Sequence, residues 1–174
     1  MIPNRIVLDT NVCLDLFVFR DPRWQTLLQA LEDGALEAVT RDDCRTEWRI
    51  VLGYAHLRLD AAARAHCADQ FDRLIRCVEP TDAGHESGEG AGNAASDNLP
   101  SVARVKLPLC RDPDDQKFLE LARDSRAATL LTKDKALLKL AGKIRRAGLF
   151  SILAPHAWQP APSEAVMCHL PSTT

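Results

Sequence analysis

The sequence has no long apolar run. No stretch of its 174 residues approaches the roughly 20 apolar residues that a membrane-spanning helix needs. The N-terminus also has no charged region followed by a long apolar segment, which disfavours a secretory signal. We therefore expect a cytoplasmic protein outside the membrane. Its length suits one domain with a substantial core.

The six cysteines show no metal-binding pattern. None of them forms a CxxC pair, and a zinc site needs closer ligand spacing than they have. Several lie inside apolar runs, as buried structural thiols do. We predict reduced thiols at all six positions, which are Cys13, Cys44, Cys67, Cys77, Cys110 and Cys168.

Aromatic residues make up only 5% of the chain, so base stacking would contribute little to any binding of nucleic acid. The net charge of −2 does not by itself indicate a polyanionic partner. Its distribution is more informative, because residues 104–146 carry 12 basic and 6 acidic side chains, whereas residues 1–103 carry 10 and 17. Such a basic segment is typical either of a polyanion-binding surface or of solvated helix faces.

Apolar periodicity predicts strands that alternate with helices. Strands are expected at 5–9, 36–40, 128–132 and 149–155, with a strand or extended segment at 103–110. Helices are expected at 20–34, 41–57, 60–79, 112–125 and 135–148. Asp21 and Asp60 suit N-caps, and Gly34 suits a helix stop. The alternation predicts an α/β fold with a parallel sheet flanked by α-helices on both faces.

Two segments are poor in residues that can form a core. Residues 81–101 contain four glycines and many small polar residues, which predicts a flexible loop within a domain of residues 1–158. From Pro155 the chain is rich in Pro and Ser, and we expect a loosely held C-terminal tail over residues 159–174.

Acidic residues occur at the carboxyl ends of predicted strands, where parallel α/β sheets usually have their functional sites. Asp9 ends the first predicted strand, and Asp134 follows the strand at 128–132. The stretch RDPDDQ supplies Asp112, Asp114 and Asp115 at the start of a helix. We expect these acids to lie along one edge of the sheet.

A further acid, Glu47, lies on the helix that follows the second strand. Each acid also has a simpler interpretation. Asp9 could be a turn residue, and Glu47 could be an exposed helical acid. Asp112 or Asp114 could cap one helix, and Asp134 could cap another. Asp115 lies one step further into its helix and has less reason to be a cap.

Clustered carboxylates repel one another unless protons or a cation intervene. Oxygen ligands of this kind suit Mg²⁺ or Mn²⁺, and no histidine near these acids favours zinc. Two such ions can promote in-line displacement at phosphorus. A phosphatase of the DxDx(T/V) type would also begin with a strand and an aspartate, but Asn11 stands where its second Asp should be.

Four motifs together resemble the acidic motifs of the PIN domain. They are VLDTNV with Asp9, RTEWRIVL with Glu47, CRDPDDQKFLELA with Asp115 and ATLLTKDKALL with Asp134. FSILAPHAW is similar to the closing strand and its proline. The resemblance covers about residues 5–158 and points to the toxin components of bacterial toxin–antitoxin systems.

The resemblance implies a Mg²⁺- or Mn²⁺-dependent ribonuclease with a parallel sheet between helices. Carried over by position, the metal and catalytic residues are Asp9, Glu47, Asp115 and Asp134. Thr10, Asn11 and Thr132 match polar positions that support such a site, and Asn11 could orient a carboxylate. Asp112 matches an additional acid that is either structural or a further ligand.

The resemblance also implies partners. A toxin of this kind would cleave RNA, with a preference for single strands, pair with an antitoxin protein and form a homo-oligomer. Basic residues near the acids could contact RNA phosphates or could instead be solvated or ion-paired, and they are Arg45, Arg49, Arg111, Lys117, Lys133 and Lys135. The alternative function is a non-catalytic RNA-binding or protein-interaction module that retains the fold.

Overall fold

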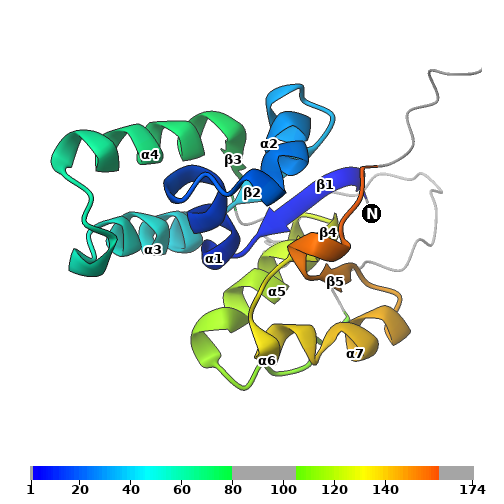
Figure 1. Ribbon diagram of the computed structural model, residues 1–174. Coiled ribbons are helices and arrows are strands. Elements are labelled where there is room, and N and C mark those ends of the chain that lie inside the picture. The colour runs from blue at the N-terminus through cyan, green and yellow to red at the C-terminus, as the bar shows by residue number, and fades with distance from the viewer. Residues whose placement is uncertain (1, 80–104, 161–174) are drawn as a thin grey trace, which may run out of the picture.

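A computed structural model describes residues 2–79 and 105–160 of the chain. Its centre is a five-stranded sheet in the order β3-β2-β1-β4-β5, with every neighbouring pair parallel. The strands are β1 (Ile2–Leu8), β2 (Glu37–Thr40), β3 (Ile75–Cys77), β4 (Ala127–Leu131) and β5 (Ser151–Leu153). Figure 1 shows β1 in the middle of the sheet, which puts the residue that follows it at the centre of the carboxyl edge.

Helices cover both faces of the sheet, as the sequence predicts (Figure 1). One face carries α1 (Thr10–Cys13), α2 (Gln25–Glu32), α3 (Asp42–Leu52) and α4 (Ala61–Leu74). The other carries α5 (Gln116–Asp124), α6 (Lys135–Leu138) and α7 (Ala141–Arg146). Alternate residues of β1 divide between the two layers, because Ile6 and Leu8 belong to the first core cluster and Val7 to the second.

The chain turns helical directly after β1, which the sequence does not predict. Asp9 occupies the N-cap position of α1, and a π-helical turn continues from Leu14 to Val18. Leu16 and Phe17 of this turn are buried in the first core cluster. Turns of this kind inside helices are frequent at functional sites.

The predicted helix at 60–79 is wrong in its last turn. Helix α4 ends at Leu74, and Ile75–Cys77 form the edge strand β3, in which Ile75 pairs with Ala38 and is 4% exposed. Burial of Ile75 and pairing with β2 outweigh the local helical pattern.

Three other predicted helices differ in extent from those in the structure. The helix at 41–57 ends at Leu52 with Gly53 at its C-cap, and a 3₁₀ turn follows at Ala55–Leu57. The helix at 135–148 divides into α6 and α7, which lets both Leu137 and Ile144 reach the second core. The segment 103–110 is predicted to be a strand or an extended segment, and its described part, residues 105–110, forms no strand. The helix at 20–34 begins as a 3₁₀ turn at Pro22–Trp24, capped by Asp21 as predicted.

The predicted flexible loop at 81–101 lies outside the described residues, as does most of the predicted tail. The segment from Pro155 is better held than its composition suggests. Pro155 is buried within a 3₁₀ turn (Pro155–Ala157), and Trp158 packs against the first core cluster.

Among the described residues, no helix is long and apolar enough to cross a membrane. The five cysteines in this part of the chain are free thiols, namely Cys13, Cys44, Cys67, Cys77 and Cys110.

Candidate metal and active site

Asp9 is the buried centre of the candidate site, with only 2% of its surface exposed. Its backbone N–H donates to the Leu131 carbonyl at 3.0 Å, and its own carbonyl accepts from the N–H groups of Val12 and Cys13. These bonds fix the residue between β1, β4 and α1. Burial raises the pKa of the Asp9 carboxyl, although the Thr132 and Asn11 hydrogen bonds oppose that shift.

Thr132 joins Asp9 to the loop after β4. Its hydroxyl donates to Asp9 Oδ2 at 2.7 Å and accepts from the Asp134 N–H at 2.9 Å. Asn11 Nδ2 lies 3.5 Å from the same Asp9 oxygen. Thr132 and Asn11 therefore lie beside the carboxylate that the sequence predicts they support.

Asp134 is the N-cap of α6. Its Oδ1 accepts hydrogen bonds from the N–H groups of Ala136 at 2.6 Å and Leu137 at 3.1 Å. The capping interpretation of Asp134 is therefore correct. It does not exclude a second role, because both bonds end on Oδ1 and Oδ2 remains for another ligand.

Glu47 reaches the site from α3. That helix is anchored by Trp48, which stacks on Phe71 with 5.3 Å between ring centroids. The Thr10 hydroxyl donates to Glu47 Oε1 at 2.6 Å, and the ammonium of Lys117 pairs with Oε2. Both carboxylate oxygens of Glu47 therefore have protein partners, one from each helical layer.

Asp112 and Asp115 have different roles in one turn. Asp112 caps the 3₁₀ turn Pro113–Asp115 by accepting from the Asp114 N–H at 3.0 Å, so it acts as a structural cap. The side chain of Asp115 makes no capping bond, as expected. The pKa of Asp115 is raised to about 6, first by burial and then by the nearby negative charges of Asp9, Asp134, Asp112 and Glu47.

At the carboxyl edge of the sheet, the acids are therefore close enough for the charge of one to shift the pKa of another. Among residues 2–79 and 105–160, however, no three His, Cys, Asp or Glu side chains form a group that could hold a metal ion as they stand. The partners explain this, because Glu47 is turned to Lys117 and Asp134 to backbone N–H groups. The possible ligand atoms are carboxylate and hydroxyl oxygens. Such atoms fit Mg²⁺ or Mn²⁺ better than zinc.

Most of the side chains that the sequence predicts to contact RNA form ion pairs with carboxylates of the protein. Arg45 and Arg49 both pair with Asp72, at 2.6 and 3.1 Å. Lys117 pairs with Glu47. Within the described ranges, the candidates that are exposed and belong to no ion pair are Arg111 and Lys135.

Sequence reasoning missed Asp15, a buried acid in the π-helical turn. Its Oδ2 accepts from Trp24 Nε1 at 3.1 Å and pairs with Lys133 Nζ at 2.7 Å. The contact explains why Lys133 is not free for RNA, and it ties the loop before α6 to the first helical layer. The signal in the sequence was an acid inside the apolar run VCLDLF.

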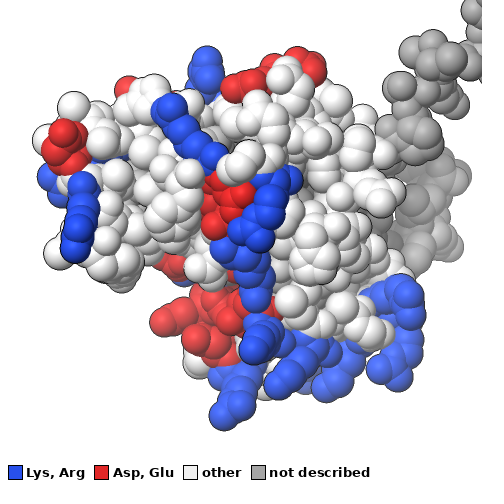
Figure 2. Space-filling view, viewed as in Figure 1, with Lys and Arg blue, Asp and Glu red and all other residues white. Residues whose placement is uncertain are grey.

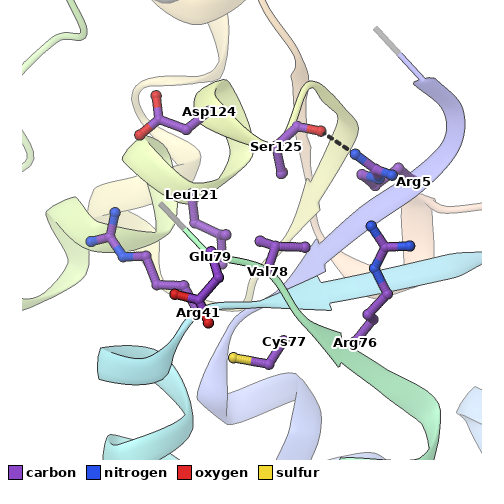
Figure 3. Close-up of a pocket in the computed structure, with 9 residues that line it drawn as sticks. All are labelled: Arg5, Arg41, Arg76, Cys77, Val78, Glu79, Leu121, Asp124 and Ser125. Carbon is purple, nitrogen blue, oxygen red and sulfur yellow. Dashed lines mark hydrogen bonds between the residues drawn. The ribbon is translucent and has the colours of Figure 1, made fainter. Parts of the chain in front are cut away.

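A separate pocket of about 330 Å³ lies away from these acids, and none of Asp9, Glu47, Asp115 or Asp134 lines it. Figure 3 shows Arg5, Arg41 and Arg76 around it, with Arg5 bonded to the Ser125 carbonyl. Because Arg5 and Arg76 pair with Glu37, and Arg41 with Asp43 and Glu120, the pocket offers no uncompensated positive charge.

The fold and the acids define an α/β protein with a carboxylate site at the carboxyl edge of a parallel sheet. The family model of the PIN domain matches residues 5–136, a segment that contains all four acids. The chain therefore belongs to the PIN domain family, whose members are generally nucleases that use divalent metals. No curated protein matches the chain.

Proposed function

We propose that this PIN domain is a Mg²⁺- or Mn²⁺-dependent endoribonuclease whose metal site consists of Asp9, Glu47, Asp115 and Asp134. The observation that carries the proposal is the gathering of acids at one edge of the sheet, where Thr132 links the Asp9 carboxylate to the backbone of Asp134. The charges of Asp9, Asp134 and Glu47 also add to burial in raising the pKa of Asp115. Such a group is most stable with a divalent cation among its oxygens.

The chain's own residues would hold the ligands in place. Thr132 and Asn11 orient the buried Asp9 carboxylate, and Thr10 orients Glu47. A bound Mg²⁺ or Mn²⁺ would activate a water and stabilise charge on the phosphate oxygens. Hydrolysis adds that water across the P–O3′ bond, leaving a 5′-phosphate and a 3′-hydroxyl.

The finer assignment is the toxin of a bacterial toxin–antitoxin pair, acting in the cytoplasm. It is supported by the likeness of the four acidic motifs to those toxin components. The assignment includes an antitoxin protein as partner and a homo-oligomer as the working form. The same support applies to single-stranded RNA as the preferred substrate.

One observation favours the alternative, a non-catalytic RNA-binding or protein-interaction module. Lys117 neutralises Glu47, and the backbone of α6 partly satisfies Asp134, so these two carboxylates have partners without a metal. The two functions differ in a simple respect. The enzyme cleaves RNA only with a divalent metal, whereas the module binds RNA or protein and leaves the RNA intact.

The test is a cleavage assay on a mixed RNA pool with Mn²⁺ or Mg²⁺, repeated with EDTA. Asp9→Asn keeps the size of the side chain and removes the charge at the centre of the site. We expect it to lower metal-dependent cleavage by a few orders of magnitude, on the scale of losing an essential catalytic group. Asp69→Asn, at an exposed position on α4 with no ion pair in the described chain, is the matched control.

Cleavage by the wild type and by Asp69→Asn, with none by Asp9→Asn, would support the proposal. Equal cleavage by all three proteins in nuclease-free preparations would refute the assignment of Asp9. No metal-dependent cleavage by the wild type, together with stable RNA binding, would favour the non-catalytic module.

A further inference from the structure

The outer side of α6 and α7 carries five basic side chains in a short stretch. We call Lys135, Lys139, Lys143, Arg145 and Arg146 the basic α6–α7 surface, and all five are exposed. The opposite side of the same segment holds Leu137, Leu140 and Ile144 in the second core cluster. Because the apolar side chains fix the orientation of both helices, the cations are held outward on a rigid support.

The basic α6–α7 surface has no counter-charge of its own. Residues 135–160 contain no Asp or Glu, and none of the ion pairs among the described residues involves a side chain of α6 or α7. By contrast, Arg45 and Arg49 share Asp72. Five positive charges that are close together and have no ion-pair partner repel one another. Binding of an external polyanion relieves that repulsion.

The surface begins at the candidate active site. Asp134 caps α6, and Lys135 is the first residue of that helix. Figure 2 shows the basic side chains along the lower rim of the molecule, below α6 and α7, next to a group of acidic side chains. A polyanion lying on this surface would therefore have one end beside the acids.

We propose that the basic α6–α7 surface binds the phosphate backbone of the single-stranded RNA and leads it to the acidic site. This inference rests on the proposed function, and it replaces most of the predicted RNA contacts, since Lys135 alone is shared with them. Even if α6 and α7 were collinear, residues 135–146 would span at most about 16 Å, so the surface covers only a few phosphates.

The chemistry of the surface favours RNA over an acidic protein partner. Protein interfaces are enriched in aromatic residues and depleted in lysine. Three of these five cations are lysines, and no large exposed hydrophobic residue of the described chain lies between Lys135 and Arg146. A row of charges without an apolar anchor suits a phosphate backbone, which is bound by charge without sequence readout.

The test measures RNA binding in EDTA, so that no cleavage is needed. A fluorescent single-stranded RNA longer than the surface is titrated with the full chain at salt concentrations from about 50 to about 200 mM. The test variant, K139Q/K143Q/R146Q, removes three cations of the surface. The matched control, R58Q/R64Q/R73Q, removes three exposed arginines on or beside α4 that belong to no ion pair in the described chain.

We expect K139Q/K143Q/R146Q to weaken RNA binding on the order of tenfold to a hundredfold and to reduce the slope of log K against log salt by about 2. The control should bind nearly as tightly as the wild type. Thermal melts of both variants check that the fold is kept. Asp9→Asn, which retains the surface, should bind RNA at least as well as the wild type.

Three outcomes would overturn the inference. These are equal weakening by both triple variants, no weakening by K139Q/K143Q/R146Q, and no RNA binding by the wild type. Competition by polyglutamate as effective as that of an RNA of equal charge would assign the surface to an acidic protein instead. RNA binding that depends on the surface in a chain that cleaves nothing would sustain the inference and refute the nuclease proposal.

Discussion

Asp9 shows how one carboxylate can be both buried and available. Its backbone is fixed by β4 and α1, and Thr132 and Asn11 contact the same side-chain oxygen, Oδ2. Burial without these donors would raise the pKa of the Asp9 carboxyl further and so oppose metal binding. The neighbouring hydroxyl and amide therefore matter as much as the acid itself.

Asp115 predicts a dependence of stability on pH. Its folded-state pKa of about 6 exceeds the ordinary value of 3.8, so the folded protein binds this proton more tightly than the unfolded chain does. The stability that protonation provides is complete below the ordinary pKa and is lost as pH rises through about 6. In EDTA, Asp115→Asn should flatten this decline. Urea unfolding between about pH 4 and pH 7 measures it.

Asp69→Asn serves as the control for that series, because it removes an exposed carboxylate that does not belong to the proposed metal site. If Asp115→Asn and the wild type lose stability equally between about pH 4 and pH 7, the charges around Asp115 are not coupled as described. The raised pKa of Asp9 contributes in the same direction, so some decline should persist in the variant.

The ion pair between Lys117 and Glu47 predicts that this lysine competes with the metal for the Glu47 carboxylate. In the metal-free protein it is the cation that neutralises Glu47, and its side chain is 19% exposed. Lys117→Met should lower the metal-free stability by about 1–2 kcal/mol, because Glu47 then faces the other acids alone. The same change should increase the rise in melting temperature on adding Mn²⁺. Thermal melts with EDTA and with Mn²⁺ give both quantities.

Lys143→Met is the matched control for Lys117, since it removes an exposed cation that belongs to no ion pair in the described chain. An unchanged metal-free melting temperature for Lys117→Met would mean that the ion pair with Glu47 contributes nothing. A smaller response to Mn²⁺ would mean that Lys117 supports the metal site and does not compete with it.

At the scale of elements, α6 links the candidate site to the core. Asp134 caps its N-terminus, and Leu137 is fully buried one turn later. Asp134→Asn keeps a good N-cap and removes the charge, so we expect metal-free stability close to that of the wild type. Asp134→Ala loses the cap and should cost about 1 kcal/mol. Denaturant unfolding in EDTA compares the two.

The two Asp134 variants should behave alike towards metal. Both lack a carboxylate, so both should show a smaller rise in melting temperature with Mn²⁺ than the wild type. A wild-type response in Asp134→Asn would show that Asp134 is a cap and nothing more. That result would remove one residue from the proposed metal site.

Elements also show where local pattern fails. Ile75–Cys77 continue the helical pattern of α4 but form a strand, because the edge of the sheet beside β2 offers backbone partners and a buried place for Ile75. The pattern of residues 135–148 predicts one helix, but the segment forms the two helices α6 and α7. This division lets Leu137 and Ile144 both reach the core. Pairing and burial with distant segments decided these cases.

At the scale of the whole molecule, the site lies where both helical layers meet the sheet. Glu47 comes from α3 on one face, and Asp115 precedes α5 on the other. A metal held between them binds only the folded chain and should therefore stabilise all of it. At a hundredfold excess over Kd the gain is about 2.7 kcal/mol, or about 5–10 °C in Tm for a domain of this size.

Calorimetric or fluorescence melts with Mn²⁺ measure this shift, and Asp9→Asn should lose most of it. The control is again Asp69→Asn, which should respond as the wild type does. If Mn²⁺ leaves the wild-type melting temperature unchanged at millimolar concentration, the acids do not form a divalent metal site in the isolated chain.

The sequence by itself determined the architecture and supplied the candidates for the proposed site. Apolar runs alternating with amphipathic helices define a parallel α/β sheet, and strands of such a sheet must end at one edge. That rule brings Asp9 and Asp134 together without further information. Local composition also identified the caps at Asp21 and Asp60, both of which the structure has.

Only the tertiary structure decided which charges are neutralised and which remain. Arg45, separated from Asp72 by 27 residues, is paired with it, and Lys133 is paired with the buried Asp15. The cations of α6 and α7 have no such partner in the described chain. Sequence neighbours cannot reveal this difference, because an ion pair depends on packing between helices that are distant along the chain, and burial sets its strength.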